Sequence, residues 1–296
     1  MLVKAFAKVN LGLFVGNART DGYHDVHSVV LSVDLFDLVD VEVKDANEKT
    51  AEITVEGCDF VRQEKNTAYA AVRNFLTEFN HSDKSVSVKI TKNIPVAAGF
   101  GGSSADAAGV LFALAKYFGV DINSERMLAV AAKCGSDVAA MTSGGCVEVL
   151  GRGEKVKKLS VDTDFNLVLA VGESCSTAKV FAAFDSVAQK TRDDVSSVKE
   201  GLKNGDIKRI AAAIKNDLTL PCLTVYPRQK KFICDCEKIV GIAPILSGSG
   251  GGVFWLTENF LESERICNLL TAKGVKAYVC KGVANGVETV ETDLKN

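Results

Sequence analysis

Alternating apolar and polar positions mark the first part of the chain. Residues 3–15 mix apolar and polar side chains, residues 26–38 and 39–43 are rich in valine and leucine, and residues 51–55 continue the pattern. Such alternation is typical of half-buried strands. Turn-forming residues at 17–23 separate the first two stretches. The pattern therefore predicts a mostly antiparallel sheet that the chain enters early.

Apolar residues three and four positions apart predict helices further along. Residues 67–79 carry this spacing, with Asn66 and Thr67 as suitable cap residues. The same reasoning predicts helices at residues 105–118, 124–134, 176–189, 207–214, 229–240 and 260–272. Strands are predicted within residues 85–90, 141–150, 165–171, 243–256 and 275–279, and a polar loop at residues 190–197.

The order of these elements indicates the fold class. Strands and helices alternate without a strict strand–helix–strand rhythm, which favours α+β over a doubly wound α/β sheet. The 296 residues are about the length of two domains. A polar connector at residues 151–158 suggests the boundary. We therefore expect an N-terminal domain at residues 1–155 and a C-terminal domain at residues 156–296.

A glycine-rich run between a strand and a helix is the most informative stretch. Gly99, Gly101 and Gly102 leave out side chains where a backbone bends sharply or approaches a ligand. Ser103 and Ser104 follow and can cap the helix. Free N–H groups at a helix N-terminus suit an anion such as phosphate. A tight turn before a capped helix explains the same residues, so both interpretations stay open at this point.

Two familiar phosphate loops are excluded. The P-loop requires a lysine directly after its glycine, and no lysine follows the glycines of this run. The dinucleotide fingerprint requires a third glycine three residues after the second, where Ser104 stands.

Composition narrows the class of partner. The chain is 47% hydrophobic and 24% charged, as in an ordinary globular protein. A net charge of −2 gives no field that attracts nucleic acid or a membrane surface, so we expect a small-molecule partner. No apolar run reaches the ~18 residues of a membrane span.

The cysteines indicate the compartment. Nine of them are scattered along the chain, and no secretory signal is visible at its start, which favours reduced thiols in the cytoplasm. Cys234 and Cys236 have no second pair at the spacing of a zinc site, so we interpret them as ordinary helix residues.

Three features of the chain occur together: Lys8 in an apolar strand, the glycine-rich run, and a second glycine loop at residues 247–252. In this combination the chain resembles the GHMP kinases, the superfamily of galactokinase, homoserine kinase and mevalonate kinase. The resemblance implies a two-domain α+β GHMP kinase fold, with ATP and substrate in the cleft between the domains. The residues that it assigns to ATP are Pro95, Val96, Ala97, Ala98, Gly99, Phe100, Gly101, Gly102, Ser103, Ser104 and Ala105, with Lys92 and Asn66 near the adenine.

Further segments extend the resemblance from Lys4 to about Gly286. Residues 7–11 and 19–24 carry it most specifically, and residues 135–138 and 246–251 are also similar. They resemble members that phosphorylate the tertiary hydroxyl of a cytidine-diphosphate-linked methylerythritol in the non-mevalonate isoprenoid pathway. We therefore expect an ATP-dependent kinase, with Mg²⁺ accompanying ATP and the metal ligands unassigned. The alternatives are a kinase for another small alcohol, such as homoserine, and a nucleotide-binding protein without catalysis.

The resemblance also implies roles for two charged residues. Asp137 becomes the carboxylate that accepts the proton of the alcohol, and Lys8 the cation that stabilises charge on oxygen. By residue type alone, a turn aspartate is the favoured interpretation of Asp137 and an edge-strand lysine that of Lys8. The match to the family motifs reverses that preference. The presence of both argues against a protein that only binds a nucleotide.

The acceptor pocket is implied in the same way. Tyr23 and His24 become the cytidine pocket, Phe181 its second aromatic face, Thr177 a support for base or ribose, and Asn10 a guide for the acceptor hydroxyl. Without the resemblance, Tyr23 would be a turn aromatic and Phe181 a buried helix residue.

Overall fold

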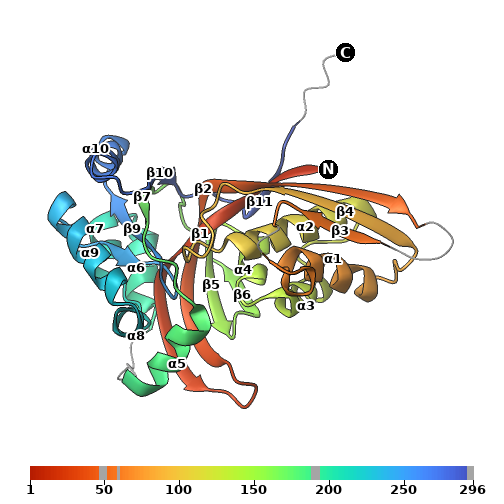
Figure 1. The fold of residues 1–296 in the computed structure, drawn as a ribbon, viewed down its shortest axis with the longest axis horizontal. Helices are drawn as coiled ribbons and strands as arrows, with labels where there is room; N and C mark the ends of the chain where they lie inside the picture. Colours follow the sequence, from red (N-terminus) through yellow and green to blue (C-terminus); the bar gives the residue numbers. More distant parts are fainter. Residues whose placement is uncertain (47–51, 59–60, 188–193, 292–296) are drawn as a thin grey trace.

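Two sheets organise the molecule (Figure 1). The computed structural model describes residues 1–46, 52–58, 61–187 and 194–291. The larger sheet has the strand order β11-β1-β2-β4-β3, with β5 beside β2 and β6 beside β5. Its strands are β1 (Leu2–Ala18), β2 (His24–Asp45), β3 (Ile53–Glu56), β4 (Lys84–Thr91), β5 (Cys146–Gly151), β6 (Lys155–Lys158) and β11 (Val287–Thr289).

The larger sheet is antiparallel except where β3 runs parallel to β4, which confirms the expected mostly antiparallel sheet. The two stretches at residues 26–38 and 39–43 are one long strand, β2. Residues 26–31 of β2 pair with β5 and residues 38–45 pair with β4, while β1 lies along the other side. The middle of β1 is buried almost without interruption, so its polar side chains are held inside the protein.

Helices α1 to α4 pack around the larger sheet on the right of Figure 1. They are α1 (Thr67–Glu78), α2 (Gly102–Phe118), α3 (Glu125–Cys134) and α4 (Val138–Ser143), preceded by a 3₁₀ turn at Gln63–Lys65. Asn66 caps α1 by accepting a hydrogen bond from the main chain of Ala68, as expected. In α2, a Cβ at Gly109 would lie 3.1 Å from Val39 and 3.2 Å from Ala5, so the helix lies close against β1 and β2.

The smaller sheet has the order β10-β7-β9-β8 and is wholly antiparallel. Its strands are β7 (Asn166–Val171), β8 (Ile245–Leu246), β9 (Gly252–Thr257) and β10 (Ala277–Lys281). The helices of this half are α5 (Thr177–Val187), α6 (Ser196–Asn204), α7 (Ile207–Ala213), α8 (Thr219–Val225), α9 (Pro227–Val240) and α10 (Phe260–Thr271). These elements confirm the α+β class.

Four expectations from the sequence are wrong. Helix α2 begins at Gly102 with Gly101 as its N-cap, so Ser103 and Ser104 lie in the first turn and neither caps it. Residues 151–158 are not a plain connector, because β6 forms a hairpin with β5. The strand predicted at residues 275–279 is not the last, since β11 follows and pairs with β1.

The fourth error concerns helices, because α4, α6 and α8 were not expected. Helix α6 begins inside the predicted polar loop, of which residues 190–193 lie outside the described residues. In the part of the chain that the structure describes, no helix combines the length and the apolar character needed to cross a bilayer. The domain boundary between residues 155 and 156 stays a prediction.

Candidate active site

One cavity of about 1030 Å³ gathers the predicted site residues. Each residue predicted to bind ATP or acceptor, or to catalyse, lines it except Ala105, which is wholly buried in α2. Segments from both halves form its walls, including β1, the glycine run, α5 and residues 248–250. The cavity therefore lies where the two sheets meet.

Lys8 and Asp137 face each other in this cavity. The ammonium of Lys8 is 3.4 Å from Oδ2 of Asp137 and donates to Oδ1 of Asn10 at 2.8 Å. Residues two apart on a strand share a face, which places Lys8 and Asn10 together on β1. Asp137 is the N-cap residue of α4, but its carboxylate makes no cap hydrogen bond and remains turned to Lys8. A buried ammonium thus adjoins a half-exposed carboxylate.

Asn10 is fixed in turn by Ser28 on the neighbouring strand. Its side-chain amide donates to Oγ of Ser28 at 2.9 Å, and that hydroxyl donates to the carbonyl of Gly12 at 2.6 Å. These hydrogen bonds connect three buried side chains, those of Lys8, Asn10 and Ser28. Buried polar groups held in this way have little freedom to reorient.

The glycine run is packed against the second glycine loop. Gly99 has φ of +74°, and a Cβ there would lie 2.6 Å from the carbonyl oxygen of Ser247 and 2.8 Å from that of Gly250. Oγ of Ser247 also donates to the carbonyl of Gly99 at 3.2 Å. Only glycine allows backbone to approach backbone so closely at this φ.

Phe100 shows how the run is anchored. Its carbonyl accepts a hydrogen bond from the N–H of Lys8 at 3.0 Å, and its ring is wholly buried. The first N–H groups of α2 therefore come to lie beside Lys8, since Gly101 is the N-cap of α2 and a Cβ there would lie 3.0 Å from the Lys8 side chain. Four such N–H groups have no partner within a helix, so an anion there would be well bound.

The residues predicted to bind cytidine surround the other end of the cavity. The rings of His24 and Phe181 are 5.4 Å apart, and Nε2 of His24 is 2.9 Å from Oδ1 of Asp185 on α5. Tyr23 stands apart from them and is 49% exposed. Oγ1 of Thr177 is 2.8 Å from Oγ of Ser249, which joins α5 to the second glycine loop. The cavity is thus lined by an exposed and a half-buried aromatic ring, and such rings can stack on a planar base.

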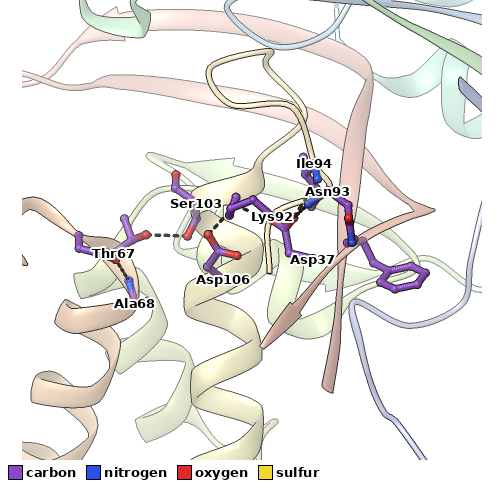
Figure 2. A network of polar contacts seen from close by, with 10 residues as sticks. Asp37, Thr67, Ala68, Lys92, Asn93, Ile94, Ser103 and Asp106 are labelled. Carbon is purple, nitrogen blue, oxygen red and sulfur yellow. Dashed lines mark hydrogen bonds and ion pairs between the residues drawn. The ribbon is translucent and has the colours of Figure 1, made fainter. Parts of the chain in front are cut away.

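A buried ionic network supports the glycine run from below (Figure 2). The ammonium of Lys92 contacts Oδ2 of Asp37 at 2.5 Å and Oδ2 of Asp106 at 2.6 Å. Oδ1 of Asp37 accepts from the main chain of Asn93 and Ile94, at 2.6 and 2.8 Å. The carboxylate of Asp37 therefore fixes the chain where it enters the run, and Lys92 joins β2 to α2.

Two carboxylates and one ammonium share this buried site, and the pKa values of Asp106 and Lys92 are shifted there. Burial, and then the charge of Asp37, raise the pKa of Asp106 to about 7. Burial favours a lower pKa for Lys92, but the charges of Asp106 and Asp37 outweigh it and raise that pKa. Oδ1 of Asp106 has no hydrogen-bond partner among the described residues, so no hydrogen bond from them stabilises a negative charge on that oxygen.

Asp106→Asn is expected to flatten the dependence of stability on pH. Because the folded pKa of Asp106 is raised to about 7, its contribution is present in full below the unfolded value of 3.8 and is lost as the pH rises to about 7. Asparagine keeps the neutral shape and cannot ionise. Between about pH 5 and pH 7, wild type should lose up to about 2–3 kcal/mol more of its unfolding free energy than the variant. Urea unfolding at a series of pH values measures the unfolding free energy of both proteins. The same change with pH in wild type and variant would contradict the prediction.

Three residues at this site were missed from the sequence: Asp37, Asp106 and Arg152. Asp37 is a fully buried acid within the apolar strand β2, which is the kind of signal that could have found it. Asp106 is a buried acid within an alanine-rich helix and gives the same signal. Arg152 lines the cavity from the turn after β5, and an arginine between two glycines gives no such signal.

The described residues contain no group of three or more histidine, cysteine, aspartate or glutamate side chains arranged to hold a metal ion. Cys234 and Cys236 both lie in α9, as predicted for ordinary helix residues.

The fold and the cavity define a GHMP kinase. The family described as "GHMP kinases N terminal domain" matches residues 66–152, which include α1, the glycine run and Asp137. The chain is 32% identical to the 4-diphosphocytidyl-2-C-methyl-D-erythritol kinase of Caldicellulosiruptor saccharolyticus, over 91% of this chain and 92% of that one. It is 34% identical to the enzyme of that name from Caldanaerobacter subterraneus subsp. tengcongensis, over 97% and 98% of the two chains.

A solved structure agrees. The crystal structure of 4-(cytidine 5'-diphospho)-2C-methyl-D-erythritol kinase matches with a TM-score of 0.75 and 28% identity, over 95% of this chain and 99% of that one. The chain belongs to the family of 4-diphosphocytidyl-2-C-methyl-D-erythritol kinases. Its two-domain GHMP kinase fold, expected from the glycine loops, is thereby confirmed.

Proposed function

We propose that this protein transfers the γ-phosphoryl group of ATP to the tertiary 2-hydroxyl of 4-diphosphocytidyl-2-C-methyl-D-erythritol. One observation carries the proposal. The Lys8 and Asp137 pair, 3.4 Å apart, lies in the same cavity as a glycine-bounded helix N-terminus and the aromatic residues Tyr23 and Phe181. One cavity thus contains a proton acceptor, a site for phosphate and a site for a planar nucleobase.

On the donor side, the phosphates of ATP would rest on the free N–H groups of the first turn of α2. Main-chain donors at a helix N-terminus are fixed in place before the ligand arrives, so they stabilise phosphate at little cost in reorganisation. Asn66 and Lys92 line the same end of the cavity and are the residues that we assign to the adenine side.

Magnesium fits this site only as a companion of ATP. With no cluster of three acidic or imidazole ligands among the described residues, the ion would be held mainly by phosphate oxygens and water. The hydroxyl of Ser104, which lines the cavity, is the protein ligand that we propose. The ion would supply positive charge against the terminal phosphates.

On the acceptor side, Asp137 would accept the proton of the tertiary hydroxyl while the oxygen attacks the γ-phosphorus. Lys8, held by Asn10, would stabilise the negative charge on the transferring oxygens. Phosphoryl transfer needs little covalent help, so alignment of the two substrates supplies much of the rate. The cytosine would lie between Tyr23 and Phe181, with His24 beside its polar edge.

A coupled assay of ADP release tests the proposal. The cytidyl alcohol should be phosphorylated with a kcat/KM at least about a hundredfold above that of homoserine or mevalonate, because a site built for polar partners rejects molecules that lack them. Turnover of homoserine in preference to the cytidyl alcohol would refute the proposed substrate. Binding of ATP without turnover of any alcohol would refute an enzyme. The domain boundary at residues 155 and 156 and a cytoplasmic location belong to the same proposal.

A further inference from the structure

The proposed acceptor brings a charge problem into the cavity. A cytidine diphosphate carries at least two negative charges between its base and its alcohol. Two of the cations that line the cavity are already paired, Lys8 with Asp137 and Lys92 with Asp37 and Asp106. Lys65 and Arg152 are the other lysine and arginine residues of the lining. Lys65 ends the 3₁₀ turn beside Asn66, on the donor side.

Arg152 stands between the two ends of the acceptor site. Its guanidinium carbon is 5.2 Å from the centre of the Tyr23 ring, which we assign to the base. The next residue, Gly153, packs on the loop of Asp137, because a Cβ there would lie 2.0 Å from the carbonyl oxygen of Ser136. Arg152 therefore lies between the loop that carries Asp137 and the ring of Tyr23.

The charge of Arg152 is not used within the described protein. One Nη donates to the carbonyl of Ala132 at 3.5 Å, and its main-chain N–H donates to Glu154. No ion pair joins its guanidinium to a carboxylate of the described residues. The carboxylate of Asp21, on which the charge of Arg152 also acts, is already engaged by the N–H of Tyr23 and by Arg19. A half-buried guanidinium with spare donors is well suited to a phosphate.

We infer that Arg152 binds the diphosphate of the cytidyl substrate, which makes it a specificity-determining residue for a nucleoside diphosphate. The inference rests on the proposed function. The planar fork can lie on the face of Tyr23 opposite the cytosine and direct two N–H groups to phosphate oxygens. Tyr23 then stacks on the cytosine, and Arg152 binds the negatively charged diphosphate attached to the same nucleoside.

The competing explanation is that Arg152 only holds the ring of Tyr23 in position and does not contact the ligand. The two explanations differ in one measurable way. Positioning of Tyr23 would affect every ligand that carries cytosine, whereas a phosphate contact would affect only those that carry phosphate.

Calorimetric titration of the full-length protein with cytidine and with CDP separates them. Wild type should bind CDP more tightly than cytidine. Arg152→Met should weaken CDP about ten- to a hundredfold and leave cytidine within about twofold. Tyr23→Ala should weaken both ligands by a similar factor, and Arg152→Lys should recover part of the CDP affinity. In turnover, Arg152→Met should raise the KM of the cytidyl alcohol and leave that of ATP unchanged.

Arg126→Met is the matched control. Arg126 also lies over an aromatic ring, 4.6 Å from the centre of Phe79, but it is on the surface of α3 and outside the cavity. Its loss should change neither affinity. Equal weakening of cytidine and CDP by Arg152→Met would leave only the positioning of Tyr23 and overturn the inference, as would unchanged CDP affinity. If wild type does not prefer CDP to cytidine but still phosphorylates the cytidyl alcohol, the inference fails and the proposed function stands.

Discussion

Asp137→Asn is expected to lower kcat by about 10²–10⁴-fold and to leave the Kd of ATP within about twofold of wild type. The amide is of similar size but cannot take the proton of the acceptor hydroxyl. Little of the fold depends on this carboxylate, because it is 42% exposed and does not cap α4. The proposed phosphate site is main chain of α2, which the substitution leaves untouched. Single-turnover kinetics and ATP titration measure the two quantities.

Asp121→Asn is the control for this change. Asp121 is an exposed aspartate in the loop before α3 and accepts from the main chain of Asn123, so it undergoes the same loss of charge away from the cavity. The kcat of the Asp121→Asn variant should equal that of wild type. Turnover retained by Asp137→Asn would remove this residue as the base, and a matching loss of ATP affinity would mean that it acts through the donor site.

Lys92→Met is expected to lower the free energy of unfolding by about 3–5 kcal/mol at pH 7, because it leaves two buried carboxylates without their cation. The methionine retains most of the buried stem. Since the pKa of Asp106 is already about 7, protons can replace part of the lost charge as the pH falls. The difference from wild type should therefore narrow from about pH 8 to about pH 5. Urea unfolding at the two pH values checks both statements.

Lys84→Met tests whether burial is the cause. Lys84 begins β4, the strand that ends just before Lys92. It also contacts two carboxylates, those of Asp45 and Asp83, but these are at the surface. Water can solvate those carboxylates after the change, so stability should hardly alter. Equal losses in the two variants would show that the number of ion pairs, rather than their burial, sets the effect.

Periodic elements of the fold could be predicted from the sequence, and the short ones could not. Strand β1 and helices α1 and α10 follow patterns long enough to identify them. Helix α8 contains Pro221 and has seven residues, so its pattern is too brief to stand out. Strand β11 has three residues, and its existence depends on β1 lying beside it, far earlier in the chain.

The site followed the same rule. Motif positions such as Lys8 and Gly101 could be taken from a resemblance because the motifs are contiguous, although their roles stay predictions. Capping by Ser103 was wrong because Gly101, at φ of +77°, begins the helix earlier than the serines suggested. Arg152 could not be found, since its only sign is the distance to Tyr23 across the cavity. Contacts between remote segments carry no local pattern.

The short strand β11 has a consequence for how such a protein can change. The chain leaves the larger sheet after β6, builds the smaller sheet, and returns at Val287 to pair with β1 at the outer edge. Neither half is therefore one continuous segment of the chain. A single break in the sequence cannot separate, duplicate or exchange either half intact. A recombination event that imported a foreign C-terminal half would also have to import a matching edge for β1.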